Sequence, residues 1–182
     1  ANKLSFSRFC QSWFNFAPLP DCERIMGYQL IETLENNTSG VISMTVSAIP
    51  QDGIDLIVHL STRRTSTSTN LELKPNGIAG GTGVALQGDG SSASSLAAWQ
   101  SLQTPSSATA NTFASVQYYI PNYTGSQSKV YSIDLVTENN ATLAYQRIQA
   151  VSTTITAAIT SLTIEALFAV GTTLSVYKIT AD

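Results

Sequence analysis

The chain has 182 residues, of which 43% are apolar and only 12% are charged, and its formal net charge is −3. A chain of this length fits one domain, and the apolar share is too high for a disordered protein. Lys and Arg total only 9, too few for the basic surface that nucleic-acid binding needs. One His and few carboxylates leave little from which to build a catalytic site. We therefore expect neither an enzyme nor a nucleic-acid partner.

The first 25 residues differ from the rest because aromatic side chains concentrate there. Several are three or four positions apart, a spacing that predicts a short helix with an aromatic stripe, ended by Pro18 and Pro20. Either the protein's own sheet or a partner can bury such a stripe, and both alternatives stay open. We expect an anchoring arm over residues 1–25 and a β-sandwich over 26–182. The expected partner-binding side chains are Phe6, Phe9, Trp13, Phe14 and Phe16.

The two cysteines, Cys10 and Cys22, lie in the same segment. They could close a short disulfide loop, but no secretory signal precedes them, so free thiols are favoured. Two thiols and one distant His do not make a ligand set, so no metal site and no cofactor is expected. The longest apolar stretch, residues 155–170, is interrupted by Glu165 and several hydroxyl side chains. We therefore expect no membrane span.

From about Tyr28 onward the sequence predicts strands. Apolar and polar residues alternate with a period of two over 54–60, 130–136, 162–170 and 174–179, as in strands with one buried face. Turn residues separate these runs, at the spacing typical of sandwiches and barrels. We expect about eight to ten strands in an all-β, jelly-roll-like antiparallel sandwich.

The segment 77–111 interrupts this pattern because it is rich in Gly, Ser, Ala and Thr. We expect one weak strand near residues 83–87, followed by a long loop that Trp99 pins to the body. The run from Gly77 to Gly83 resembles a phosphate loop only superficially, because no Lys-Ser/Thr and no predicted helix follow.

The remaining candidate residues point weakly to chemistry. His59 occupies a polar position of a predicted strand, where a surface role is expected rather than catalysis. Asp52 and Asp55 fit a turn and a strand start. The pair Arg63-Arg64 either binds an anion or an acidic partner surface, or is a solvated strand end, the interpretation that we favour.

The β part resembles a family of small β-sandwich virion proteins encoded in the structural regions of tailed-bacteriophage genomes. The similarity runs from about Ser47 to Thr180, and its closing pattern of Phe168, a Gly-Thr turn and Tyr177-Lys178-Ile179 is the most specific part. The sequence departs from the family at Lys178, where members often carry Gly. The elements that carry the similarity read, in chain order, IDLIVHLS, RR, LELKPNG, TANTFAS, IPNY, ITSLTI and F-x-x-GTT-LSVYKI.

This resemblance implies a virion protein, assembled in the host cytoplasm, with no catalytic residues. The leading expectation is a capsid decoration or cement protein that binds the major capsid protein, as a homotrimer by analogy with other decoration proteins. The alternative is a tail, baseplate or fibre component that binds a receptor or carbohydrate through the long loop and through Tyr118, Tyr119 and Tyr123. A carbohydrate-binding module outside any virus is a third interpretation.

Overall fold

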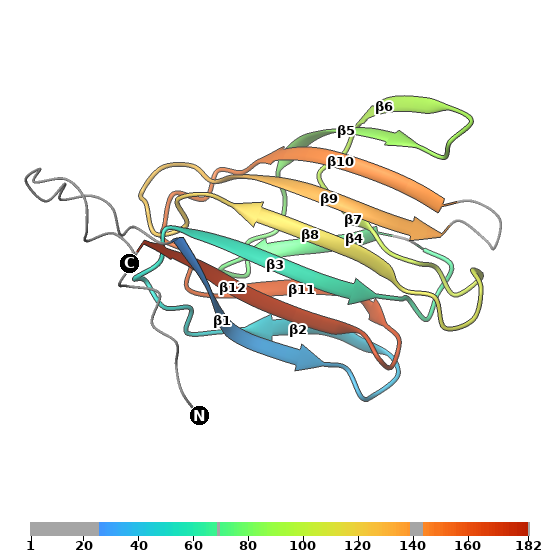
Figure 1. Cartoon of the computed structure of the whole chain (residues 1–182), viewed down its shortest axis with the longest axis horizontal. Coiled ribbons are helices and arrows are strands. Elements are labelled where there is room, and N and C mark those ends of the chain that lie inside the picture. Colours follow the sequence, from blue (N-terminus) through green and yellow to red (C-terminus); the bar gives the residue numbers. More distant parts are fainter. Residues whose placement is uncertain (1–25, 69, 139–143, 182) are drawn as a thin grey trace, which may run out of the picture.

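The computed structural model describes residues 26–68, 70–138 and 144–181 and places them in two antiparallel β-sheets (Figure 1). The arm 1–25, with its predicted helix, its aromatic side chains and both cysteines, lies outside the described residues. The strands are β1 (Met26–Glu35), β2 (Val41–Val46), β3 (Asp55–Thr62), β4 (Asn70–Pro75), β5 (Thr82–Gly88), β6 (Ala93–Ala97), β7 (Ser101–Leu102), β8 (Ala114–Ile120), β9 (Val130–Glu138), β10 (Ala144–Ser152), β11 (Leu162–Phe168) and β12 (Thr173–Ala181).

The two sheets have the strand order of a jelly roll. The small sheet runs β2-β11-β4-β7, and the first four strands of the large sheet run β1-β12-β3-β8. Along the chain these eight strands pass from one sheet to the other at every step except from β4 to β7, which is the double-layer arrangement of jelly-roll domains. Two hairpins, β5–β6 and β9–β10, are inserted and extend the large sheet in the order β8-β9-β10-β5-β6 (Figure 1). The predicted jelly-roll-like sandwich is therefore confirmed.

The core forms where the alternating side chains of the two sheets meet. Leu56, Val58 and Leu60 of β3 are buried in the same core cluster as Leu162 and Ile164 of β11, as the period of two predicts. Among the largest fully buried side chains are Tyr118, Tyr123 and Phe168. The expectation that Tyr118 and Tyr123 are exposed is wrong, because both side chains are buried: the Tyr118 hydroxyl bonds to that of Ser101, and the Tyr123 hydroxyl donates to the Pro50 carbonyl oxygen.

The Gly/Ser-rich segment holds more structure than the sequence predicts. The weak strand near residues 83–87 is confirmed as β5, but the short strands β6 and β7 replace part of the expected loop, so that the described residues form twelve strands. Small side chains hide these strands from a pattern search, because they lack the apolar alternation that identifies a strand. Trp99 packs partly buried against the core and pins the segment, as expected.

Lys178, a buried lysine of β12, forms an ion pair with Asp52. The Lys178 Nζ lies 2.5 and 2.6 Å from the two carboxylate oxygens of Asp52, and the lysine side chain is buried. Its hydrogen bond lowers the pKa of Asp52 from the ordinary value. Lys178 therefore forms a structural ion pair.

Acid should weaken this pair. A carboxylate whose pKa is lowered in the folded protein stabilises the fold above its unfolded pKa and loses that effect as the pH falls through its folded pKa. We expect Asp52→Asn to be less stable than the native chain at about pH 6, and the difference to shrink at about pH 3, on the acid side of the aspartate range. Urea unfolding at both pH values measures this, and a difference that does not change with pH would contradict the assignment.

Candidate functional site

The large sheet turns one face toward the small sheet and presents the other, its outer face, to solvent. The strand register aligns side chains across all eight strands of this outer face. One complete row reads Leu30, Tyr177, Ile57, Tyr119, Ser132, Ala150, Val84 and Ala97. The row contains no charged side chain.

The next row divides the outer face into a polar and an apolar part. Thr33, Ser175, His59, Gln117 and Asp134 occupy it from β1 to β9. On β10 and β5 the same row continues with Ile148 and Leu86, which are followed by Ser95 on β6. In this row β10 and β5 therefore present aliphatic side chains, whereas the strands from β1 to β9 present polar ones.

We call the outer face of β9, β10 and β5 the apolar patch. Its aliphatic side chains are 45–65% exposed and come from three neighbouring strands. Large apolar side chains that gather on one exposed face mark an interaction site, whereas scattered ones do not. The patch consists of Val84, Leu86, Val130, Val136 and Ile148.

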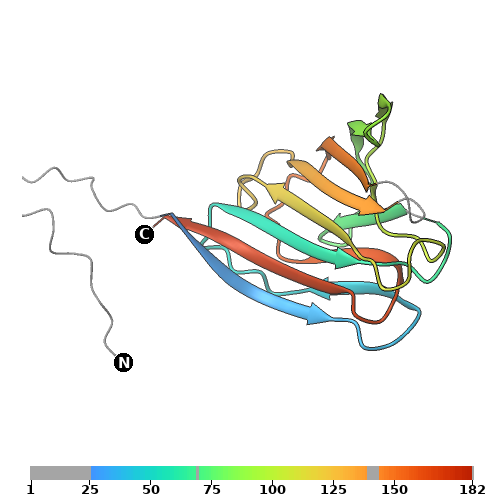
Figure 2. The same ribbon diagram turned by 45° about the vertical axis from the view of Figure 1, so that its right-hand side comes forward.

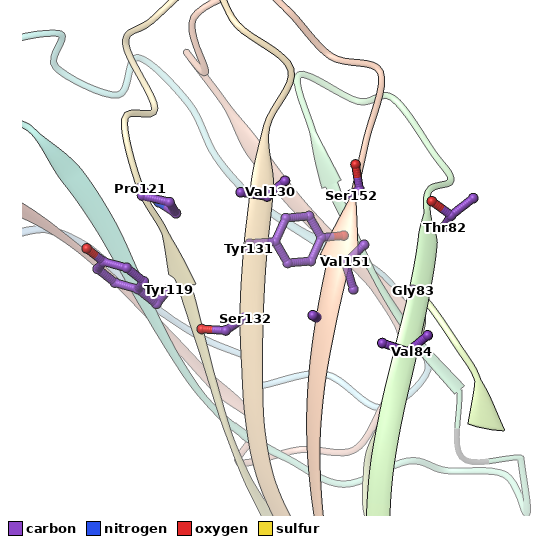
Figure 3. Close-up of a pocket in the computed structure, with 11 residues that line it drawn as sticks. Thr82, Gly83, Val84, Tyr119, Pro121, Val130, Tyr131, Ser132, Val151 and Ser152 are labelled. Atoms are coloured by element: carbon purple, nitrogen blue, oxygen red, sulfur yellow. The ribbon is translucent and has the colours of Figure 1, made fainter. Parts of the chain in front are cut away.

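A groove of about 570 Å³ opens at one end of the patch. Tyr119 and Pro121 lie on one side of it and Thr82 and Val84 on the other, with Ser132 between them (Figure 3). The groove exists because the residues between its walls are small. Ser132 and Ala150 are neighbours on β9 and β10 and fill little of the space above the sheet.

The β5 side of the groove requires a glycine at position 83. A Cβ atom on this residue would lie 2.3 Å from the Ala98 carbonyl oxygen and 2.9 Å from that of Ala150. Both contacts are with backbone, so no side chain could move to relieve them. Only glycine lets β5 approach both neighbours at this position.

On the opposite side of the groove, the carboxylate of Asp55 orients the side chain of Tyr119. The Tyr119 hydroxyl donates a 2.6 Å hydrogen bond to Asp55, whose other oxygen accepts the Asn122 backbone N–H at 2.8 Å. The bond to Asp55 raises the pKa of Tyr119. Asp55 thus starts β3, as predicted, and also orients an aromatic wall of the groove.

Two of the inward side chains of β10 are polar, which is unusual for a buried face, and the apolar Val151 follows them on the same face. Arg147 and Gln149 point into the sandwich and are 4% and 5% exposed. Their side-chain nitrogens donate to the Gln100 carbonyl oxygen, and Gln149 also donates to that of Ala98. Burial lowers the pKa of Arg147. In the middle of this strand two polar side chains are therefore inside, and the aliphatic Ile148 between them is outside.

The sequence-predicted residues are not brought together into a reactive site. His59 lies on the polar part of the outer face, where its ring meets that of Tyr177 edge-on at 5.7 Å. Asp52 forms an ion pair with Lys178, and Asp55 accepts a hydrogen bond from the Tyr119 hydroxyl. Among the described residues, no cluster of His, Cys, Asp or Glu could hold a metal ion, and no helix is long and apolar enough to cross a membrane.

Arg63 and Arg64 fit neither of the two interpretations drawn from the sequence, because both bind backbone carbonyl oxygens of their own chain. Arg63 donates hydrogen bonds of 2.7–3.0 Å to four backbone carbonyl oxygens, those of Ser106, Ala108, Thr109 and Thr112. Arg64 donates to the Asn70 carbonyl oxygen at 2.6 Å. Both are structural residues rather than an anion site or a solvated strand end.

The apolar patch is the feature that sequence analysis missed. The signal is present in β5, where Val84 and Leu86 alternate with Gly83 and Ala85. Alternation identifies the strand but does not say which face meets the core.

Comparisons with known proteins do not assign the chain to a family. No protein-family model, curated protein or solved structure matches the chain.

Proposed function

We propose that this chain is a non-enzymatic virion structural protein, a capsid decoration or cement protein that binds the major capsid protein and stabilises the phage head. The observation that carries the proposal is the reversed polarity of the β5–β10 region, with Leu86 and Ile148 outside and Arg147 and Gln149 inside. An aliphatic outer face is costly in water and becomes favourable when another protein covers it.

The chemistry of the apolar patch favours a protein partner. Its members carry no charge, so they provide nothing to attract phosphate groups. A specific interface buries about 800 Å² on each partner, an area that an eight-stranded face can supply. In a shell, several such contacts act together and increase retention without any new chemistry.

The arm provides a second contact in this proposal. Phe6, Phe9, Trp13, Phe14 and Phe16 are the proposed anchors on the major capsid protein, since buried aromatic side chains dominate interface energies. A homotrimer around a local threefold axis, taken by analogy with other decoration proteins, would place three arms and three patches on neighbouring capsomers.

The stoichiometry of purified phage particles tests the proposal. Quantitative mass spectrometry should find the chain in intact heads at a copy number comparable with that of the capsomers. A few copies per particle, confined to the tail fraction, would replace the head assignment with the alternative of a tail, baseplate or fibre component. Absence from particles would overturn the virion assignment.

One substitution tests the arm. Trp13→Ala should weaken binding to heads by about 2–4 kcal/mol, the range for an aromatic anchor at an interface. Titration of heads that lack the protein with the full-length variant measures this effect. If the variant instead lowers the melting temperature of the free chain and binds normally, the arm packs on its own domain. Deletion of residues 1–17 is the more severe test and should leave the β domain folded.

A further inference from the structure

The outermost strand of the large sheet, β6, has no neighbour on its free side. It ends the sheet at the opposite edge from β1 (Figures 1 and 2). None of its five residues is buried, and only Leu96 is partly covered. The β5–β6 hairpin therefore exposes both faces of β6 as well as its hydrogen-bonding edge.

The register shows which backbone groups of β6 are free. Ala98 N–H donates to the Gly83 carbonyl oxygen, and Asp89 N–H donates to that of Ser92. In an antiparallel ladder, hydrogen-bonded pairs alternate with non-bonded pairs. The backbone groups of Ser94 and Leu96 therefore point toward β5. Those of the alternate residues point away from the sheet, and these residues are Ala93, Ser95 and Ala97.

The opposite edge is protected against pairing, and β6 is not. β1 contains a register shift between Leu30 and Glu32, and it carries the charged side chains of Glu32 and Glu35. Bulges and charges of this kind keep an edge strand from pairing with another chain. β6 contains only Ala, Ser and Leu, and the sequence carries no charged side chain between Asp89 and Lys129.

We propose that β6 is a self-association edge, where two copies of this chain pair antiparallel about a twofold axis through Ser95. Ser95 then faces Ser95 of the second copy, and Ala93 faces Ala97. All three facing pairs use the outward backbone groups. In each pair the two residues exchange two N–H···O hydrogen bonds, as in the hydrogen-bonded pairs of an antiparallel ladder. An isologous contact of this kind closes on itself and requires only one surface.

The pairing joins two eight-stranded sheets into one continuous sheet. The side chains that face one another are Ala and Ser, so neither bulk nor like charge opposes the approach. The apolar patches of both copies then lie on the same outer face, on either side of the axis. This contact goes beyond the proposed function, since it makes no use of the arm or of the capsid partner, and it could link two trimers across a twofold position.

Paired charges test the register. The double variants Ala93→Lys/Ala97→Lys and Ala93→Glu/Ala97→Glu place like charges opposite one another, so each should dimerise at least about tenfold more weakly than the native chain. A mixture of the two should restore a one-to-one dimer, as should Ala93→Lys/Ala97→Glu alone. Analytical ultracentrifugation of the full chain measures all five samples, the native chain included. No rescue by mixing, or a native chain that stays monomeric up to its solubility limit, would overturn the proposal.

A cross-link tests the axis independently. In a Cys10→Ser/Cys22→Ser background, Ser95→Cys should form a disulfide-linked dimer, because a hydrogen-bonded pair separates Cα atoms by about 5.5 Å. Ser94→Cys is the matched control, because the two copies of that residue would lie about 8 Å apart, too far for a disulfide. Equal cross-linking of both variants, or none at residue 95, would refute a twofold axis there. Neither experiment uses capsids, so failure here leaves the proposed function standing.

Discussion

Replacing two aliphatic side chains beside the groove, Val84→Asp and Val130→Asp, should abolish decoration of phage heads. Both side chains line the groove, from β5 and β9, and they are 65% and 52% exposed in the free chain. Desolvating a carboxylate costs several kcal/mol in an interface that supplies no cation. Two carboxylates should therefore weaken binding by more than about 4 kcal/mol, which is about a thousandfold in the dissociation constant.

The chain offers a closely matched control for this double variant. Ile42 and Val170 are 67% and 52% exposed, but they lie in β2 and in the turn that follows β11. Ile42→Asp/Val170→Asp adds the same charge at the same exposure and should bind heads normally. Sedimentation of each variant with heads that lack the protein measures bound copies. Equal loss of binding in both variants would mean that added negative charge, rather than the apolar patch, controls attachment.

The sandwich could be predicted from sequence because its central strands obey a local rule. In β3, β8 and β9 every second side chain faces the core, and most of these inward side chains are apolar. The patch could not be predicted in this way, because in the middle of β10, from Arg147 to Gln149, the polar side chains are inside and the aliphatic one is outside. Reading it requires knowledge of the sheet order, which places β10 and β5 beyond the eight strands of the jelly roll.

The arginine pair shows a second limit of sequence analysis. Adjacent arginines on a strand end suggest a surface charge, but the residues that Arg63 binds lie far away along the chain. Arg63 bonds to carbonyl oxygens 43–49 residues ahead of it in sequence. Such a contact is a product of the fold, since it depends on where the segment between β7 and β8 returns to the sheet. No local pattern predicts it.

Removal of the Arg63 guanidinium should therefore destabilise the whole domain. Its two terminal nitrogens hold four backbone carbonyl oxygens within residues 106–112. Hydrogen bonds from a charged donor contribute about 1.5–3 kcal/mol each. The freed carbonyl groups regain water in part, so we expect Arg63→Met to lower the free energy of unfolding by about 3 kcal/mol. That is a large share of the 5–15 kcal/mol typical of a domain.

The adjacent residue supplies the comparison that isolates this effect. Arg64 donates to one carbonyl oxygen, that of Asn70, so Arg64→Met should lower the free energy of unfolding by only about 1 kcal/mol. Both variants lose one positive charge at the same strand end. Urea unfolding gives the two free energies, and limited proteolysis should cleave only the Arg63 variant faster within residues 105–112. Equal destabilisation of the two would indicate a general charge effect. A result ordered as expected establishes that Arg63 holds the loop before β8, the strand that carries Tyr119 to the groove.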